Sequence, residues 1–461
     1  MAREGATAGP AARELIMNNE TLQPYRAEHD RFMATTATIP WLSEFRHAGW
    51  GQFAAQRFPT PDREEWKYTD VTPLVQQDYV LAKTAVPELS QSRLTASSVD
   101  TAARQRLVFV NGRYSAAHSD IRDLPSPVIL TSLQQQLERD PQPLQQPLTG
   151  FSSSDDNGFL ALNSAYLNQG VYLNIPNGMS LAEPILLLFI SAPGEAHAAT
   201  MSQLRNLIQV GAHCRLSLII QHLGLSTQPL FNNLVTQIDI ARGAELRFYH
   251  LQEEAAQTLQ ISNTRIRQAA SSQLHCLDLA LGGLLARHDL QIELQDAEAR
   301  CDLNGLYLAD GRQHLDHHVR IDHARPQGIS RACYKGILEG RGRAVFNGRV
   351  LVHADAQKSD ARLTNNNLLL SERAEVDTKP QLEIFADDVK CSHGTTVGHL
   401  DQQAIHYLRS RGIDPVTARN LLIYGFAADI LGHVDHLPVR NHLQKRLLTR
   451  LSAGKALKGL L

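Results

Sequence analysis

The chain has 461 residues, enough to bury a large core and to hold two or three structural units. Its 45 basic and 47 acidic side chains leave a net charge of −2, which argues against broad binding of nucleic acid or of an anionic membrane surface. Five cysteines, an odd number with no CxxC pair, argue against a disulfide framework and favour reduced thiols. The N-terminus lacks a signal-peptide core, and the longest apolar run is far below the ~20 residues of a membrane span. These features predict a cytoplasmic protein.

Residues 1–150 are expected to form an N-terminal helical or mixed region. Over residues 22–58 the apolar spacing is helical, and Pro40 suits the start of a helix. In the segment EEWKYTD, Trp66 and Tyr68 are interpreted as core aromatic residues of this region.

Residues 151–398 contain short runs rich in Val, Ile and Leu, separated by polar turns. Comparable starts recur with a period near 28 residues, at Val171, Leu204, Phe231, Leu259, Arg287, His314, Gly342 and Ala374. Such a period without long helices indicates a solenoid, because each unit is too small to bury a face alone. The prediction is a mainly β fold whose core is a right-handed parallel β-helix-like solenoid. Its equivalent turns should form one row, around Gly211, Gly243, Ala270, Asp296, Gln327, Asp355 and Asp387.

Residues 399–461 are predicted to form a C-terminal helical module. Asp401 suits an N-cap and Gly412 a helix stop, and Asp414 with the following proline suits the start of a second helix. The apolar stripe of that second helix is broad and includes Leu421, Leu422 and Phe426. Two interpretations stay open: the stripe packs within the module and onto the last rung, or part of it receives a partner.

The segment HLDHHVRIDH, residues 314–323, is rich in histidine and aspartate. On a strand, His314, Asp316 and His318 share one face with Arg320, and His317 lies on the other. Such a face could bind zinc, but the permanent charge of Arg320 opposes a cation. A solvated outer face of the solenoid is therefore the favoured interpretation.

Residues 374–399 carry the most distinctive chemistry of the chain. Two short strands, QLEIF and VKCSH, are predicted around an acidic turn, and Cys391 and His393 then point to the same face. A thiol beside an imidazole can become a thiolate, the form that binds soft metals and persulfide sulfur. A cysteine in a stacked strand can also be a small buried hydrophobe, which is the interpretation for the other four cysteines, Cys214, Cys276, Cys301 and Cys333.

Several long segments of the chain resemble one known family. They are TNNNLLLSERAEVDTKP, TKPQLEIFADDVKCSHGTTVG, KGILEGRGRAVFNGRV, HYLRSRGID and, less closely, REEWKYTDVTPL. They resemble the SufB/SufD family of the Suf system for iron–sulfur cluster assembly. The SufB branch has an acidic EHE-type signature where this chain has Cys391-Ser392-His393-Gly394, so the resemblance is to the SufD branch.

The resemblance implies a scaffold subunit that is not itself an enzyme. It implies pairing with SufB through the β-helix cores, with Cys391 and His393 at the interface near a transient iron–sulfur cluster. It also implies that the ATPase SufC docks on the C-terminal helices, around Leu421, Leu422 and Phe426. No GxxxxGK[ST] motif occurs in the chain, so no ATP site of its own is expected. The isolated chain could form a homodimer.

Two enzyme hypotheses remain beside the scaffold. A β-helix polysaccharide lyase or hydrolase needs paired carboxylates, and Asp387 with Asp388, near Lys390, is the only tight acidic pair near the motif. Consecutive strand residues point in opposite directions, so this pair is poorly placed for acid and base roles. The other hypothesis is a zinc enzyme built on residues 314–323.

Overall fold

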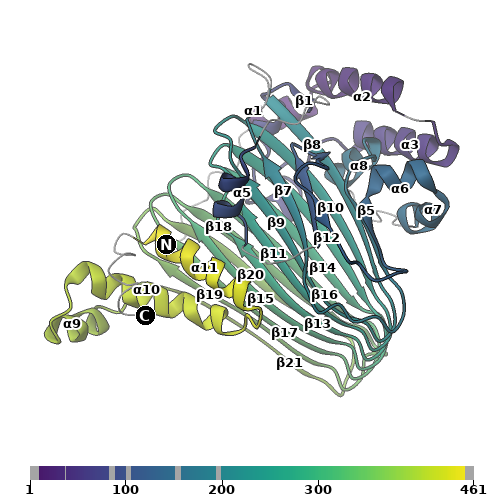
Figure 1. The fold of residues 1–461 in the computed structure, drawn as a ribbon. Coiled ribbons are helices and arrows are strands. Elements are labelled where there is room, and N and C mark those ends of the chain that lie inside the picture. Colours follow the sequence, from purple (N-terminus) through teal and green to yellow (C-terminus); the bar gives the residue numbers. More distant parts are fainter. Residues whose placement is uncertain are drawn as a thin grey trace.

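Two long sheets dominate the protein (Figure 1). The structure is a computed structural model that describes residues 10–36, 38–82, 89–99, 105–150, 157–193 and 199–451. The first sheet contains β1 (Tyr79–Leu81), β5 (Ile129–Ser132), β6 (Val171–Ile175), β8 (Ala199–Val210), β10 (Leu230–Ile240), β12 (Thr258–Gln268), β14 (Leu285–Leu294), β16 (His314–His323), β18 (Arg343–Val352) and β20 (Glu375–Ile384). The second contains β2 (Gln105–Val110), β3 (Arg113–Tyr114), β4 (Asp120–Ile121), β7 (Ile185–Ser191), β9 (Arg215–Gly224), β11 (Glu245–Glu253), β13 (Gln273–Ala280), β15 (Arg300–Ala309), β17 (Ile329–Leu338), β19 (Asp360–Leu369) and β21 (Lys390–Gly398).

From β6 onward the chain alternates between the two sheets, so that each turn of the solenoid adds one strand to each. The order in the first sheet is β20-β18-β16-β14-β12-β10-β8-β6-β5, and in the second β21-β19-β17-β15-β13-β11-β9-β7-β2-β3. The successive strands from β6 to β20 and from β7 to β21 pair in parallel, and Phe231 lies opposite Leu259, as the repeat spacing predicted. The predicted β-solenoid is therefore confirmed.

The turns at one edge of the solenoid form the predicted row. Backbone hydrogen bonds join them from rung to rung, for example from Gly243 N to Ala270 O at 3.0 Å and from Gln327 N to Gln357 O at 2.9 Å. Six of the seven turns, all but the last one at Asp387, place one residue in the left-handed region of backbone conformation, at His213, Gly243, Ser271, Glu298, Gln327 and Lys358. Stacked turns of one shape keep successive rungs in register.

The main core lies between the two sheets, where alternate side chains of each strand point inward. Cys214, Cys276 and Cys301 are buried in this core, as their interpretation as small hydrophobes expected, and Cys333 is half-buried. Burial raises the pKa of Cys276 and Cys301, so both stay as neutral thiols.

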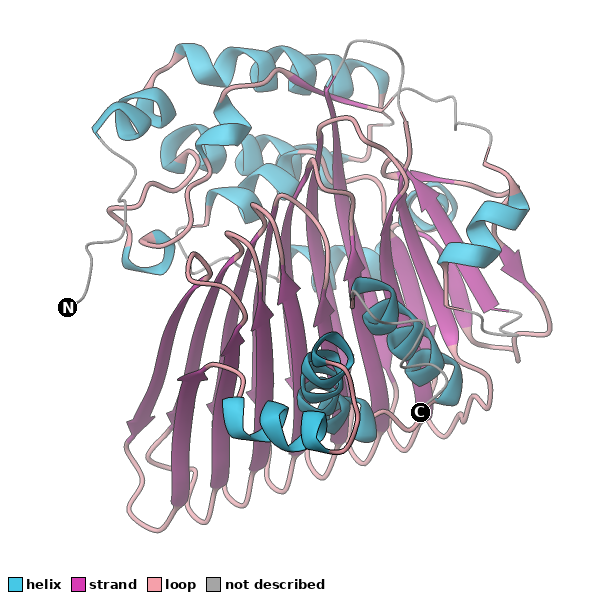
Figure 2. Cartoon of the chain, turned by 90° about the vertical axis from the view of Figure 1, so that its left-hand side faces the viewer, coloured by secondary structure: helices cyan, strands magenta, loops and turns pink. Residues whose placement is uncertain are grey.

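The N-terminal helices cover the outer face of the first sheet (Figure 2). They are α1 (Pro10–Met17), η1 (Glu20–Leu22), α2 (Gln23–Thr35), α3 (Pro40–Gln56), η2 (Glu64–Trp66), α4 (Thr72–Val75), α6 (Leu133–Arg139), α7 (Gln142–Thr149) and α8 (Gly158–Ala165). The short helix α5 (Gln91–Ser97) lies instead against the second sheet, where Leu94 belongs to the same apolar cluster as Val108 of β2. Pro40 begins α3, as predicted. Phe53 and Phe159 pack with Phe231 and Leu259, whose side chains leave the outer face of β10 and β12.

The outer face of β16 is covered by residues 63–69, which corrects the interpretation of that face as solvated. The Asp316 side chain is 0% exposed. It accepts a hydrogen bond from Thr69 Oγ1 at 2.5 Å and pairs with Arg287 Nη1 at 2.9 Å and His318 Nε2 at 3.1 Å. Burial acts to raise the pKa of Asp316, but His318 and Arg287 outweigh it and hold the pKa well below its usual range. The cluster is an ion-pair seam rather than a zinc site.

The same N-terminal segment reaches along several rungs of the first sheet. The guanidinium carbon of Arg287 lies 3.7 Å from the ring centroid of the buried Trp66. Glu64 forms an ion pair with Lys379 on β20, the last strand of this sheet. Tyr68 is 37% exposed, so its predicted core position is wrong, whereas that of Trp66 is confirmed.

Three C-terminal helices follow the last rung, and the second and third of them pack on the outer face of the second sheet (Figure 2). They are α9 (Gln402–Ser410), α10 (Pro415–Gly432) and α11 (Leu437–Arg450). Asp401 and Asp414 are the N-caps that the sequence predicted, and Gly412 follows α9 with a positive φ of 87°. Across the described residues, no helix has both the length and the apolar character needed to cross a membrane.

A buried carboxylate fastens α11 to the solenoid. Glu253 ends β11, and its side chain is 0% exposed. It lies 2.8 Å from His442 Nε2 and 2.5 Å from Arg446 Nε, and accepts a hydrogen bond from Gln221 Nε2 at 2.5 Å. Burial acts to raise the pKa of Glu253, but His442 and Arg446 outweigh it and lower the pKa.

We expect Glu253→Gln to loosen α11 selectively. Removing one partner of a buried pair costs about 3 kcal/mol, which corresponds to roughly 100-fold faster amide exchange in α11 at neutral pH. Because the folded-state pKa is lowered, this contribution is present above the ordinary glutamate pKa of about 4.3 and is lost as the pH falls through the folded-state value. Hydrogen–deuterium exchange measures this contribution as the ratio of the exchange rates of the α11 amides in the variant and in the wild type at each pH.

Glu245→Gln is the matched control, since Glu245 lies on the same strand but pairs with Arg215 and Arg247 at the surface. An exposed pair contributes about 1 kcal/mol or less, so exchange in α11 should change little. Equal exchange in α11 for both variants would contradict the role of Glu253.

Candidate functional site

The last rung of the solenoid leaves two strand edges open. β20 and β21 each end their sheet, so each pairs with a neighbour on one side only. No side chain of either strand is fully buried, whereas β18 and β19 behind them are largely buried. The inward face of this rung is therefore an accessible surface at the end of the core.

Cys391 and His393 both lie on that inward face. In the register of β19 and β21, Cys391 lies opposite Ala361 and His393 opposite Leu363, two residues of the main core. Cys391 is half-buried and packs against the core, while His393 is exposed. The structure thus brings both predicted residues to the open end of the solenoid.

The thiolate hypothesis is not supported by the chain alone. Burial raises the pKa of Cys391, with a further contribution from Asp360, so the thiol is neutral near pH 7. His393 is not among the groups that shift the pKa of Cys391, so the imidazole of this chain does not favour the thiolate. Another group must therefore approach Cys391 before it can ionise.

Two large apolar side chains are exposed on the same last rung. Phe385, directly after β20, is 65% exposed, and Val397 on β21 is 49% exposed. Asp387 and Asp388 lie in the exposed turn between the two strands, and neither lines any of five well-formed cavities among the described residues. Those cavities therefore lend no support to the paired-carboxylate hypothesis.

The residues proposed for ATPase docking lie on α10. Leu421 and Leu422 are half-buried, and so is Phe426, which packs against the solenoid. Lys335 Nζ lies 4.7 Å from the Phe426 ring centroid and donates to its carbonyl oxygen at 3.0 Å.

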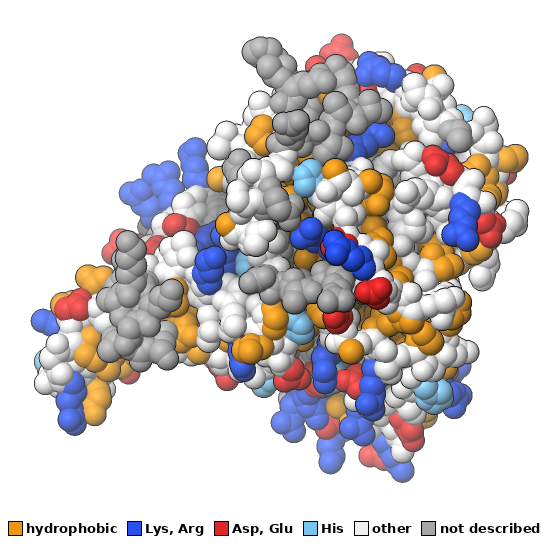
Figure 3. All heavy atoms as spheres, in the orientation of Figure 1, with side chains coloured by type: hydrophobic (Ala, Val, Ile, Leu, Met, Phe, Trp, Pro, Cys, Tyr) orange, Lys and Arg blue, Asp and Glu red, His pale blue; other side chains and the backbone are white. Residues whose placement is uncertain are grey.

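More exposed apolar residues lie on the same module, at Tyr407 of α9 (58% exposed) and Val416 of α10 (50% exposed). Figure 3 shows hydrophobic side chains on this projecting module. Sequence reasoning missed both residues, although Val416 directly follows the predicted N-cap and proline, where the first turn of a helix is usually polar.

Sequence reasoning also missed a polar cluster inside the core, made by His250, Asp278 and His288. Burial acts to raise the pKa of Asp278, but His288 and His250 outweigh it and hold the pKa well below its usual range. Burial lowers the pKa of His250. His250 and Asp278 are 28 residues apart, one period of the repeat, so comparing inward positions one period apart could have found this pair.

A polar column continues from this cluster toward the open end. The Tyr334 hydroxyl donates to Asp278 Oδ2 at 3.0 Å, and its ring covers Gly305, where a Cβ would lie 2.1 Å from the ring. The ring of Tyr307 covers Gly336 in the same way, and its hydroxyl donates to Asn367 Oδ1 at 2.5 Å. Two glycines thus make room for two buried tyrosines.

Comparison with known proteins places nearly the whole chain in one family. Residues 191–426 match the SufBD core domain of the SUF system for FeS cluster assembly, and residues 17–187 match the SufBD protein N-terminal region. An iron–sulfur cluster assembly SufBD family protein of Synechocystis is 33% identical over 85% of this chain and 86% of its own length. The iron–sulfur cluster assembly protein SufD of Escherichia coli is 30% identical over 86% of this chain and 90% of its own length. Protein ABCI7, chloroplastic, of Arabidopsis thaliana is 25% identical over 92% of this chain and 90% of its own length.

Both halves of the chain, the helical N-terminal region and the solenoid, therefore match the same family. The chain belongs to the SufBD family of the SUF system for iron–sulfur cluster assembly.

Proposed function

We propose that this chain is a non-catalytic scaffold subunit of a cytoplasmic iron–sulfur cluster assembly complex. It pairs with SufB at the open end of its solenoid and carries the ATPase SufC on its C-terminal helices. A nascent cluster is held transiently between the two scaffold chains, and ATP is hydrolysed by SufC alone. The observation that carries the proposal is the open end, where two unpaired strand edges lie beside an exposed imidazole.

Unpaired edges support pairing with another chain, because their backbone groups can accept a further strand. Pro380 removes one donor from β20, whereas β21 contains no proline and keeps all its donors. We therefore assign the main backbone pairing to β21. In the isolated chain, the same edges would pair two copies.

The chemistry of His393 and Cys391 fits a shared cluster. Imidazole is a suitable ligand for iron, and a thiol becomes a soft ligand once a metal or a cation lowers its pKa. Two donors are fewer than a cluster takes, so the remaining ligands would come from SufB. The approaching partner would also bring the metal or cation that lowers the pKa of Cys391.

The helical module supports the assignment of SufC docking. Val416 and the half-buried Leu421 and Leu422 lie on α10, and Tyr407 lies on the adjoining α9. Phe426 is held under Lys335, so we assign it the role of supporting α10 rather than contacting the ATPase.

We expect His393→Ala to lower cluster formation on the assembled complex by about tenfold or more, since losing even an outer-shell partner weakens metal sites by that amount. Cys391→Ser should have a smaller effect. Because His393 is exposed, thermal stability and complex assembly should stay at wild-type level. Iron and sulfide incorporation in the reconstituted complex is the measurement.

Ser392→Ala is the control, since Ser392 is exposed on the opposite face of β21. Undiminished cluster formation with a folded His393→Ala variant would refute this site. A His393→Ala variant that fails to fold would assign the residue to core packing instead.

Two docking variants serve as controls for each other. Phe385→Asp should lose SufB and keep SufC, because it places a charge only at the open end. Leu422→Asp should lose SufC and keep SufB. Each loss should be about 30-fold in affinity, as for an interface hot spot of about 2 kcal/mol. Pull-down with each purified partner, after a thermal-melt check of folding, is the measurement. A folded variant that retains both partners at wild-type level would contradict its assignment.

A further inference from the structure

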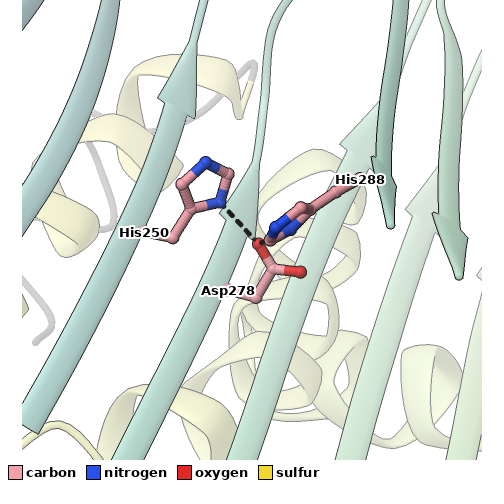
Figure 4. A group of neighbouring side chains, drawn as sticks. All are labelled: His250, Asp278 and His288. Carbon is pink, nitrogen blue, oxygen red and sulfur yellow. Dashed lines mark hydrogen bonds and ion pairs between the residues drawn. The ribbon is translucent and has the colours of Figure 1, made fainter. Parts of the chain in front are cut away.

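Three metal-ligating side chains converge inside the solenoid, away from the open end. His250 Nδ1 lies 2.8 Å from Asp278 Oδ1, and His288 Nδ1 lies 3.0 Å from the same oxygen (Figure 4). The ligand atoms of all three lie within 4.8 Å of one another. Their residues are 4%, 1% and 6% exposed, so the cluster is closed off from bulk water.

The fold itself brings these residues together. His250 on β11 and Asp278 on β13 are direct partners on adjacent rungs of the second sheet. The chain then turns through Gly282 and Gly283 into β14 of the first sheet, which carries His288. A Cβ on Gly282 would lie 2.1 Å from Glu254 O, so only glycine allows this close turn. Three different strands thus hold the three donors.

The donor set suits a divalent transition metal. Two imidazoles and one carboxylate are the ligands of many Zn²⁺ and non-haem Fe²⁺ sites. Zn–N bonds are about 2.0–2.1 Å, so ligand atoms around a tetrahedral ion are roughly 3.3 Å apart. The observed separations of 2.8 and 3.0 Å need to widen by only a few tenths of an ångström.

Further contacts would hold the ligands in place. Thr264 Oγ1 lies 2.9 Å from His288 Nε2, and a hydroxyl can accept from this nitrogen when Nδ1 binds a metal or donate to it when Nδ1 is protonated. Tyr334 donates to the second carboxylate oxygen of Asp278 at 3.0 Å, and His317 Nε2 lies 3.8 Å from it. Such outer-shell bonds orient the ligands of metal sites.

We propose that His250, Asp278 and His288 form an interior site for one divalent transition-metal ion of the zinc and ferrous class. The site is distinct from the open end: in the pairing register, the column that begins at Asp278 passes Gly305, Tyr334 and Asn365 before it reaches Thr395 of β21. The proposal does not rest on the proposed function, because it concerns only the interior of this chain.

The test uses the full chain with Cys391→Ser and His393→Ala, so that the open end contributes no ligand. We expect it to bind one equivalent of Co²⁺ or Zn²⁺ slowly, because the solenoid must open locally to admit the ion. Bound Co²⁺ should show visible ligand-field bands without a thiolate charge-transfer band. His288→Gln or Asp278→Asn in this background should weaken binding by about tenfold or more.

His275→Gln is the matched control, since His275 is also on β13 but faces outward beside Asp302. It should bind the metal like its parent. Equal binding by the His288→Gln and His275→Gln proteins would overturn the proposal, as would a parent chain that binds neither ion after prolonged incubation. If the interior variants do not fold, X-ray absorption of the Zn²⁺-loaded parent decides: two imidazoles without sulfur support the site, and any other shell overturns it.

Discussion

The hydrogen bonds between stacked rungs are the constraint on which the rest of this molecule depends. Each strand satisfies its backbone groups with the strand before it and the strand after it, so the stack cannot end without leaving one edge unsatisfied. At the beginning of the stack short antiparallel strands flank the parallel array: β5 pairs with β6, and β3 and β4 pair with β2, so β6 and β2 each have a partner on both sides. At the far end, no described strand pairs with the outer edge of β20 or of β21.

The outer faces of the two sheets also carry apolar side chains that must be buried. A separate helical region covers them on each side. The N-terminal region packs apolar side chains on the first sheet, and the C-terminal helices do so on the second. A buried ion-pair cluster lies in each seam, around Asp316 in one and Glu253 in the other. A buried charge without its partners is costly, so each cluster fixes where its region can sit more sharply than apolar contact alone.

The sequence could predict the features that local or periodic patterns encode. The solenoid followed from the repeat, and the caps at Asp401 and Asp414 followed from short-range helix rules. The seam at Asp316 could not be predicted, because Thr69 and Asp316 are 247 residues apart and no pattern links them. At the candidate site, the sequence predicted the shared face of Cys391 and His393. It overestimated the acidity of the thiol, because partial burial opposes ionisation. The position of His288 beside Asp278 could not be predicted from the repeat, because it depends on the turn geometry at Gly282 and Gly283.

The segment of residues 63–69 lies along the first sheet like a strap, and this has a consequence for how the protein can change over evolutionary time. Its contacts reach β16 through Thr69, β18 through a hydrogen bond from Asn347 to Glu65, and β20 through Glu64 and Lys379. Substitutions in the N-terminal region and in the last rungs are therefore coupled, most strongly through the buried contact between Thr69 and Asp316. A chimera that exchanges the N-terminal region between two relatives should also carry the matching outward residues of these three strands. Without them, residues 63–69 would lose their hydrogen-bond and ion-pair partners on the sheet.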